Sequence, residues 1–358
     1  MNVLQISADR SKRGILYRGS PAYERQKAYA ERFGRLDIIA FSTKGDHASA
    51  IEDGNLHIHP TNSSSRWTYV FDAIRIAKTL QKPDVVTSQD PFECGIAAWR
   101  ITQHLNVPLH VQVHTDFLSP QYSTLSFING LRIVLARFVL KRAARIRVVS
   151  NRVKESILQH YGLSTSISVL PIFVDVKKFR DAEPFDAIAL KQSATFKYKL
   201  LVVSRDAPEK NIDLAKEAFE KSAPQDACLI IVGDFTDVQE LGPRIYGMPT
   251  NNTERMYKSV DLVLVPSKYE GYGLVTIEAL AAGKPVLSTD VGIADEAGAI
   301  VTTEDTFADR LAQWFKEDGP RHGELKSYPY NNFDEYVSVY VGDIKACIEP
   351  QNGDNASL

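Results

Sequence analysis

The chain has 358 residues, more than one hydrophobic core usually supports, so two domains are expected. Its formal net charge of −2 argues against a dedicated nucleic-acid-binding protein, which would carry a clear basic excess. Cys94, Cys228 and Cys347 form no closely spaced pair, which favours small buried side chains in a reducing compartment. The N-terminal residues do not resemble a signal peptide, and no window reaches membrane-spanning length, so we expect a cytoplasmic protein.

Short runs rich in Val, Ile and Leu alternate with longer helical patterns in the first half of the chain. This alternation is typical of βα units that build a parallel sheet. We predict strands over residues 3–7, 37–41, 84–88, 109–113 and 146–150, with helices at 22–33, 69–80 and 94–104. A first doubly wound domain is therefore predicted at 1–173.

A second alternating series follows the stretch 175–199, which we interpret as a linker. Its predicted strands are 200–204, 228–233, 262–267 and 286–289. We expect a second domain at 174–335, a C-terminal helix at 336–350 that packs back toward the N-terminal domain, and a polar tail at 351–358. The predicted fold class is α/β, with two Rossmann-like doubly wound domains facing across a cleft. Ligands of such sheets bind beyond the carboxyl ends of the strands.

The segment 261–290 holds the strongest functional signal. A buried strand leads into a turn that contains Gly271 and Gly273, and a helical pattern follows. Glycines let the backbone approach a ligand, and the start of the helix offers free N–H groups and a positive dipole end. A diphosphate is the expected occupant. Glu278, about one turn into the helix, suits ribose hydroxyls, and Glu270 faces whatever is attached beyond the phosphates.

The sequence EGYGLVTIE within this segment resembles the E-x7-E motif of the family 4 retaining glycosyltransferases, which have the GT-B fold. Glu270 and Glu278 are the two glutamates, and the surrounding PS, EG, EA and GKPV positions also match. Upstream, LLVVSRDAPEKNIDLAKEAF is similar to the family's strand followed by R-x-x-x-x-K, which gives Arg205 and Lys210. Fixed cations there stabilise the charge that develops on a departing diphosphate. The resemblance covers about residues 85–300.

The resemblance implies a retaining, metal-independent hexosyltransferase with a nucleotide-diphosphate sugar as co-substrate and no other cofactor. The implied acceptor is a hydroxyl of a glycan or lipid-linked molecule in surface polysaccharide or glycolipid biosynthesis. The implied catalytic residues are Glu270, Arg205, Lys210 and His114, the last in contact with the donor sugar. The implied donor-binding residues are Glu278, Gly271, Tyr272, Gly273, Leu274, Val275, Tyr246, Gly247 and Met248, with the last three near the nucleobase.

The loop after the first strand departs from the family pattern. The family usually has a glycine-rich loop there, whereas this chain has SADRSKRGILYRGSP, with Gly14 and Gly19 separated among basic residues. The departure leaves open how this loop meets the phosphates, and shaping of an acceptor site is the alternative. By position alone, we expect acceptor contacts from Arg18, Gly19, Tyr23 and Asp90.

The stretch from Arg132 to Lys154 contains eight basic residues and no acidic one. Arg137, Lys141 and Arg145 fall four apart, so we predict that they share one face of a helix. Such a stretch can lie on an anionic membrane, which would make the protein peripheral on the inner face. The alternative is a core helix with one solvated basic side.

Two other functions remain possible from the sequence. A nucleotide-sugar epimerase of the same fold would bind the same donor and isomerise it without an acceptor. A catalytically silent donor-binding scaffold would present the basic stretch to a membrane or partner, although Glu270, Arg205 and Lys210 are all intact. Hydrolysis of a donor would exclude the scaffold.

Overall fold

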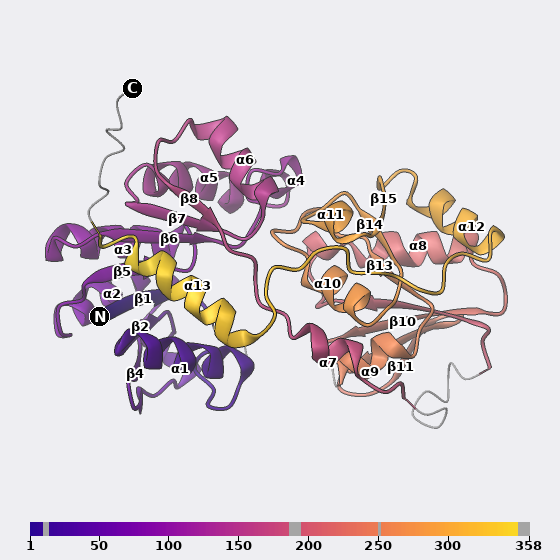
Figure 1. Cartoon of the computed structure of the whole chain (residues 1–358), viewed down its shortest axis with the longest axis horizontal. Helices are drawn as coiled ribbons and strands as arrows, with labels where there is room; N and C mark the ends of the chain where they lie inside the picture. The colour runs from indigo at the N-terminus through magenta and orange to yellow at the C-terminus, as the bar shows by residue number, and fades with distance from the viewer. Residues whose placement is uncertain (10–13, 186–194, 250–251, 350–358) are drawn as a thin grey trace. The chain divides into compact units, whose positions relative to one another are not determined.

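The computed structural model describes residues 1–9, 14–185, 195–249 and 252–349 (Figure 1). The chain divides into two compact units, each described here by itself. The N-terminal unit comprises Met1–Leu118, Ser126–Pro171 and Asn331–Leu358. The C-terminal unit comprises Ser119–Leu125 and Ile172–Tyr330. The tail predicted at 351–358 lies outside the described residues.

The described strands of the N-terminal unit form one sheet in the order β3-β4-β2-β1-β5-β6-β7-β8, parallel except where β3 meets β4. Its central strands are buried on both faces, and their sequences alternate apolar residues with polar ones such as Thr87, His110 and Gln112. These buried polar side chains bond to one another, since Thr87 lies 2.8 Å from the His110 ring and accepts from Gln112 at 3.1 Å. The strands are β1 Asn2–Ser7, β2 Arg35–Ala40, β3 Ile51–Asp53, β4 Leu56–Pro60, β5 Val85–Ser88, β6 Leu109–Val113, β7 Arg145–Val148 and β8 Ile167–Val169.

Helices cover this sheet, and serine side chains cap several of them. Ser20, Ser126 and Ser150 each accept a hydrogen bond from the backbone N–H three residues later. Helix α3 packs against both α2 and α5, whereas α1 packs against α13. The helices are α1 Pro21–Phe33, α2 Tyr69–Ala77, α3 Glu93–Leu105, α5 Phe127–Leu140, α6 Asn151–Tyr161 and α13 Phe333–Lys345, with short 3-10 turns η1 Lys44–Asp46 and η2 Arg66–Thr68.

Helix α13, yellow in Figure 1, returns the chain to the N-terminal unit and is held there by a buried polar cluster. Asp343 accepts hydrogen bonds from His110 (3.0 Å), Arg145 (2.5 Å) and Ser168 (2.7 Å). Burial by itself would raise the pKa of Asp343, but the hydrogen bonds from His110 and Arg145 lower it to about 2. The helix predicted at 336–350 thus begins at Phe333 and ends at Lys345.

The described strands of the C-terminal unit form a second sheet in the order β11-β12-β10-β9-β13-β14-β15, parallel except where β11 meets β12. The strands are β9 Tyr198–Val203, β10 Ala227–Gly233, β11 Gln239–Gly242, β12 Ile245–Pro249, β13 Leu262–Val265, β14 Val286–Thr289 and β15 Ile300–Thr302. The helices are α4 Pro120–Thr124, α7 Val176–Arg180, α8 Ile212–Ser222, α9 Thr253–Lys258, α10 Leu274–Ala281, α11 Ala294–Ala297 and α12 Phe307–Lys316, with the 3-10 turn η4 Pro208–Lys210. The core includes Phe219, Leu229, Phe307 and Trp314.

These two sheets confirm the predicted α/β class with two Rossmann-like halves. The stretch 175–199, interpreted as a linker, contains a short helix at its start, because Asp175 caps α7 and this helix packs against α9 and α10. The three cysteines are buried and free, as their small apolar surroundings predicted.

Candidate functional site

The order of the strands in the C-terminal sheet indicates where a ligand would bind. The chain leaves the central strand β9 toward β10 and β12, then crosses back to lay β13 on the other side of β9. This is the topological switch point at which ligands of open α/β sheets bind. The loops that follow β9 and β13 therefore hold the residues of interest.

Lys210 and Glu270 meet at this switch point. The Lys210 ammonium lies 2.5 Å from one carboxylate oxygen of Glu270, and the Ser267 hydroxyl donates to the same oxygen at 2.8 Å. The two loops are also joined through the backbone, because the Lys268 N–H donates to the Glu209 carbonyl at 2.8 Å. The structure thus brings together two of the predicted catalytic residues, each partly buried.

Arg205 leaves the end of β9 on the same loop but takes a different partner. Its guanidinium lies 3.0 Å from Glu209, and its side chain is 69% exposed. An exposed pair of this kind contributes little to stability, so the guanidinium can exchange Glu209 for another anion at small cost. Arg205 therefore lies on the same loop as Lys210 but takes no part in the Lys210–Glu270 pair.

The turn before α10 has the shape expected of an anion-binding helix start. Gly273 has φ +98°, a conformation that L side chains rarely adopt, and its carbonyl accepts from the Thr276 N–H at 3.1 Å. The N–H groups of Leu274 and Val275 belong to the first turn, so they have no acceptor within the helix. Gly292 packs closely against this turn, because a Cβ atom at position 292 would lie 2.3 Å from the Tyr272 carbonyl oxygen.

Glu278 lies one turn into α10 and is partly buried. Tyr257 on α9 donates a hydrogen bond to it at 2.8 Å, and Phe179 on α7 packs against the Tyr257 ring at a centroid distance of 5.8 Å. Burial raises the pKa of Glu278 to about 7, although the Tyr257 hydrogen bond opposes the shift. The Glu278 carboxylate is thus held by Tyr257 of α9, which is in turn packed against α7. These contacts of Tyr257 were not predicted from the sequence.

The three positions predicted near the nucleobase all lie on β12. Met248 is buried, and Gly247 faces the Phe235 ring so closely that a Cβ atom would lie 2.7 Å from it. Tyr246 is partly exposed, 6.4 Å from the Phe196 ring. Packing against Phe235 therefore explains the glycine at 247, and contact with a base stays a prediction for this strand.

His114 follows β6 in the N-terminal unit. Burial, with the nearby charges of Arg147 and Arg25, lowers the pKa of His114 to about 3, so the imidazole is neutral at physiological pH. It forms no hydrogen bond to any residue that the structure describes. A neutral imidazole of this kind offers one donor and one acceptor to a ligand.

The residues placed in an acceptor site by position have internal partners. Tyr23 donates to Asp53 at 2.7 Å, and Arg18 donates to the Glu52 carbonyl at 2.9 Å. Asp90 accepts from the backbone N–H groups of Phe92 and Cys94, so it caps the start of α3. Gly19 has φ +79° in a turn. These contacts give all four a structural role, and their contact with an acceptor stays a prediction.

The prediction that Arg137, Lys141 and Arg145 share one helical face is wrong. Helix α5 ends at Leu140, and Arg145 lies on β7, where it pairs with Asp343. Two more of the eight basic residues are engaged inside the unit: Arg132 pairs with Glu93 at 2.9 Å, and Arg147 is 2% exposed. The exposed cations of this stretch cluster at Arg137, Lys141 and Arg142.

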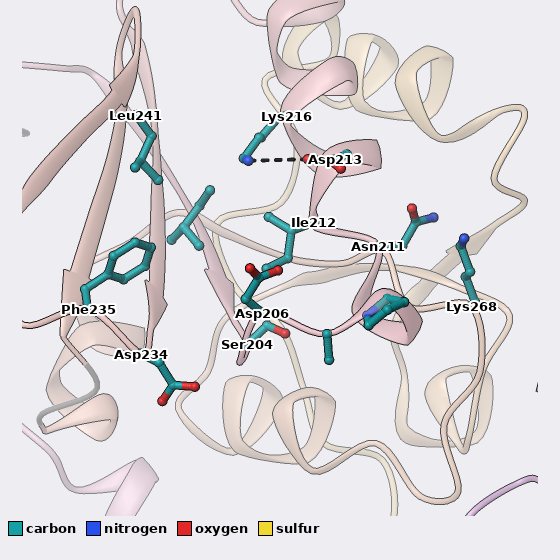
Figure 2. A pocket seen from close by; sticks show the side chains of 13 residues that line it. Ser204, Asp206, Asn211, Ile212, Asp213, Lys216, Asp234, Phe235, Leu241 and Lys268 are labelled. Carbon is teal, nitrogen blue, oxygen red and sulfur yellow. Dashed lines mark hydrogen bonds and ion pairs between the residues drawn. The ribbon is translucent and has the colours of Figure 1, made fainter. Parts of the chain in front are cut away.

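A cavity of about 760 Å³ lies beside the switch point, between the loop after β9, the start of α8 and the loop after β10 (Figure 2). Its charged lining residues are Asp206, Asp213, Lys216, Asp234 and Lys268, and Lys216 is paired with Asp213 at 3.3 Å. Three carboxylates against two ammonium groups do not favour a diphosphate. This cavity was not predicted from the sequence, because it depends on how the loops pack.

Within the described ranges, no helix is both long and apolar enough to cross a membrane. Among the same residues, no group of three or more His, Cys, Asp or Glu side chains has the arrangement of a metal site.

Two family models match the chain. One, described as Glycosyltransferase Family 4, matches residues 22–178. The other, Glycosyl transferases group 1, matches residues 197–317. The first match falls mainly on the N-terminal unit, and the second falls within the C-terminal unit and contains the switch point.

Curated relatives include the sulfoquinovosyl transferase SQD2 of Arabidopsis thaliana, 27% identical over 59% of this chain and 43% of the relative. The teichuronic acid biosynthesis glycosyltransferase TuaC of Bacillus subtilis, a putative assignment in its own name, is 28% identical over 62% of this chain and 57% of the relative. The chain thus matches about half the length of these relatives.

Solved structures share the fold. Sucrose-phosphate synthase of Thermosynechococcus elongatus aligns with a TM-score of 0.69 at 16% identity, over 97% of this chain and 94% of its own. Anabaena HepE in complex with UDP-glucose aligns with a TM-score of 0.67 at 16% identity, over the same shares.

Proposed function

Because the chain belongs to the family 4 glycosyltransferases, we propose that it transfers a hexose from a nucleotide-diphosphate sugar to a hydroxyl group. The acceptor is a glycan or a lipid-linked molecule in surface polysaccharide or glycolipid biosynthesis. The names of two relatives, in teichuronic acid and lipopolysaccharide core biosynthesis, support this setting. A UDP-sugar is the first donor to examine, since HepE was solved with UDP-glucose.

The observation that carries the proposal is the Lys210–Glu270 pair beside the start of α10, at the switch point of the sheet. In our proposal, the diphosphate lies on the N–H groups of Leu274 and Val275. Lys210, with Arg205, stabilises the charge that develops on the leaving diphosphate. These protein cations and the helix dipole take the place of a divalent metal ion.

Glu270 and the backbone of the Gly271–Tyr272–Gly273 turn hold the sugar hydroxyls in this proposal, and Glu278 binds the ribose. Tyr257 orients the Glu278 carboxylate and leaves its second oxygen for the ligand. His114 contributes a neutral imidazole to the donor sugar, which matches its lowered pKa.

The proposed reaction retains configuration at the anomeric carbon. Glu270 already accepts hydrogen bonds from Lys210 and Ser267, so it is poorly suited to act as a covalent nucleophile. We therefore propose that the acceptor hydroxyl attacks the anomeric carbon from the same face as the one from which the diphosphate departs. The bond from the anomeric carbon to the phosphate oxygen breaks, the bond to the acceptor oxygen forms, and the acceptor proton passes to the departing diphosphate.

The exposed cations at the end of α5 are proposed to contact an anionic membrane surface. Arg137, Lys141 and Arg142 are the residues of the basic stretch that remain available for this contact.

The proposed activity is tested by incubating the protein with UDP-, GDP- and ADP-hexoses and measuring release of the nucleoside diphosphate, with water as the fallback acceptor. Proton NMR of the sugar distinguishes the possible outcomes. Release of a free hexose, first formed with the donor's anomeric configuration, supports a retaining transferase. An isomerised but intact nucleotide-sugar supports the epimerase instead, and binding without any turnover supports the silent scaffold.

A matched pair of variants assigns the activity to the switch point. Glu270→Gln keeps the shape of the side chain but removes its charge, and we expect turnover to fall at least tenfold, on the order of one lost charge-assisted contact. Glu220→Gln, an exposed position on α8 of the same unit, should leave turnover unchanged.

A further inference from the structure

Helix α2, together with the η2 turn before it, repeats an exposed pattern that is found on α5, on the other side of α3. Trp67 is 88% exposed and Phe71 is 73% exposed, and the exposed Arg75 and Lys78 follow at helical spacing. On α5, Leu131 is 52% exposed and Val134 is 64% exposed, and the exposed Lys141 and Arg142 follow. Each helix therefore presents large apolar side chains first and cations afterwards.

The two patterns lie on one layer of the N-terminal unit. Helix α3 packs against both α2 and α5, and each of the three precedes a strand of the parallel series β5, β6 and β7. Helices with this connection run side by side in the same direction on one face of the sheet. The apolar ends of α2 and α5 are therefore at one end of the layer, and their basic ends are at the other.

Helix α3 contacts the basic end of α5 through aromatic rings and guanidinium groups. The Trp99 ring packs edge-on to Phe138 at 4.7 Å, and the Arg142 guanidinium lies 3.7 Å from the centre of the Phe138 ring. The Arg100 guanidinium lies 4.8 Å from the centre of the Trp99 ring. Arg100 and Arg142 thus rest on aromatic side chains while they stay exposed, so their charged groups remain at the surface.

Acidic residues are scarce on this layer. Asp72 on α2 is only partly exposed and pairs with Arg75 at 3.3 Å, and Glu93 at the start of α3 pairs with Arg132 at 2.9 Å. Helix α5 has no acidic residue. A solvent-facing layer with isolated large apolar side chains and unbalanced cations complements a surface that is anionic outside and apolar beneath.

We propose that the α2–α3–α5 layer is a docking surface for an anionic phospholipid bilayer, with Trp67, Phe71 and Leu131 entering the interface and Arg75, Lys78, Lys141 and Arg142 binding lipid headgroups. This surface goes beyond the basic stretch considered above, because it adds a second helix and an apolar contact. It does not depend on the proposed transfer reaction.

The test is co-sedimentation of the full chain with vesicles of phosphatidylcholine alone and with phosphatidylglycerol added. Binding is expected only when the anionic lipid is present, and it should weaken with salt. Phe71→Ser and Leu131→Ser should each reduce partitioning about tenfold, since each removes a large apolar side chain from the interface. Val339→Ser is the matched control, because Val339 is 40% exposed on α13, which packs with α1 away from this layer.

Tryptophan fluorescence gives a second readout that does not require loss of binding. Trp67 is the exposed tryptophan, whereas Trp99 is partly buried and Trp314 is buried. Addition of anionic vesicles should shift the emission to shorter wavelength, and Trp67→Phe should abolish most of that shift while the protein still sediments with the vesicles.

Four results would overturn the proposal. Equal binding to both vesicle types, or none to either, would exclude an anionic bilayer as the partner. If Leu131→Ser loses vesicle binding while Phe71→Ser binds fully, α2 is not part of the docking surface. Self-association of the chain that Phe71→Ser abolishes, without vesicle binding, would assign the surface to a second copy. Nucleoside diphosphate release by Phe71→Ser and Leu131→Ser in the absence of vesicles should match the wild type, which separates this test from that of the transferase.

Discussion

The Tyr257 hydroxyl on α9 donates a hydrogen bond to the Glu278 carboxylate on α10 at 2.8 Å. This contact fixes the orientation of a carboxylate whose burial raises its pKa to about 7. A carboxylate held in this way is costly for the folded protein when it ionises, which is characteristic of a residue kept for binding. Its consequences can be measured without knowing the substrate.

Glu278→Gln should make the protein more stable at pH 8 and have little effect at pH 5. The pKa of Glu278 is raised in the folded state, so the folded protein binds a proton more tightly than the unfolded chain does. Stability from this group is therefore present at low pH and is lost as pH rises from the unfolded pKa toward about 7. Thermal unfolding from pH 5 to 8 should show a gain on the order of 1–2 kcal/mol for the variant at the upper end. A gain of the same size at pH 5 would contradict this reasoning.

Tyr257→Phe should move the midpoint of the pH dependence of donor affinity to a higher pH. The Tyr257 hydrogen bond lowers the pKa of Glu278, so its loss allows burial to raise that pKa further. Ribose hydroxyls donate to the ionised carboxylate, and donor affinity in the wild type should rise between about pH 6 and 8. Titration calorimetry at several pH values measures the midpoint. An unchanged midpoint in Tyr257→Phe would show that another group controls binding.

Lys210→Ala should lower turnover about a hundredfold, because it removes the cation proposed to stabilise the leaving diphosphate. Lys216→Ala is the matched control, since Lys216 lines the neighbouring cavity and is paired with Asp213. Steady-state release of nucleoside diphosphate measures both. If Lys216→Ala loses as much activity as Lys210→Ala, the donor lies in the cavity of Figure 2 instead.

Gly292→Ala should distort the turn before α10, because its Cβ would lie 2.3 Å from the Tyr272 carbonyl oxygen and its backbone has φ +54°. We expect weaker donor binding and a loss of about 2 kcal/mol in stability. Gly342→Ala, in α13 with no atom within 4 Å of the new Cβ, should be neutral or stabilising. Melting temperatures of the two variants give the comparison. Equal melting temperatures would mean that the turn adapts freely.

Asp343→Asn should destabilise the N-terminal unit by about 3 kcal/mol, because it leaves Arg145 and His110 without their buried carboxylate. The folded pKa of Asp343 is lowered to about 2, so this stability is present above the unfolded pKa and is lost as pH falls toward 2. Thermal unfolding at pH 7 and at pH 3 should therefore show a smaller deficit at the lower pH. Asp334 lies on the same helix as Asp343 and forms an exposed ion pair with Arg32 of α1. Asp334→Asn should therefore cost less than about 1 kcal/mol.

Much of the fold was predictable because its strands are short, buried and apolar. The strand predicted at 109–113 coincides with β6, and that at 286–289 coincides with β14. The hairpins β3–β4 and β11–β12 were missed for two reasons. The edge strands β3 and β11 are short and mostly exposed, and their partners β4 and β12 break the apolar pattern with His, Gly and Pro. Helix α7 was missed because five residues are too few to show a helical period.

The site was predictable only where residues lie close together in the sequence. Glu270, the glycine turn and Glu278 fall within nine residues, so a linear motif contains them. The Tyr257 contact to Glu278 spans 21 residues, and the Asp343 contact to His110 spans 233. Burial of Arg147 and the end of α5 at Leu140 depend on tertiary packing, so the basic stretch could not be divided correctly from its composition.

The central claim is that the C-terminal unit binds a nucleotide-diphosphate sugar at the β9–β13 switch point, and a thermal-shift panel of UDP-, GDP- and ADP-hexoses tests it most directly. A donor at about a hundred times its dissociation constant adds roughly 2.7 kcal/mol to stability. We predict that one donor raises the melting temperature of the wild type and of Lys216→Ala, and that Glu278→Gln loses most of this shift. Equal shifts in Glu278→Gln and the wild type, or no shift with any donor at millimolar concentration, would contradict the proposed site.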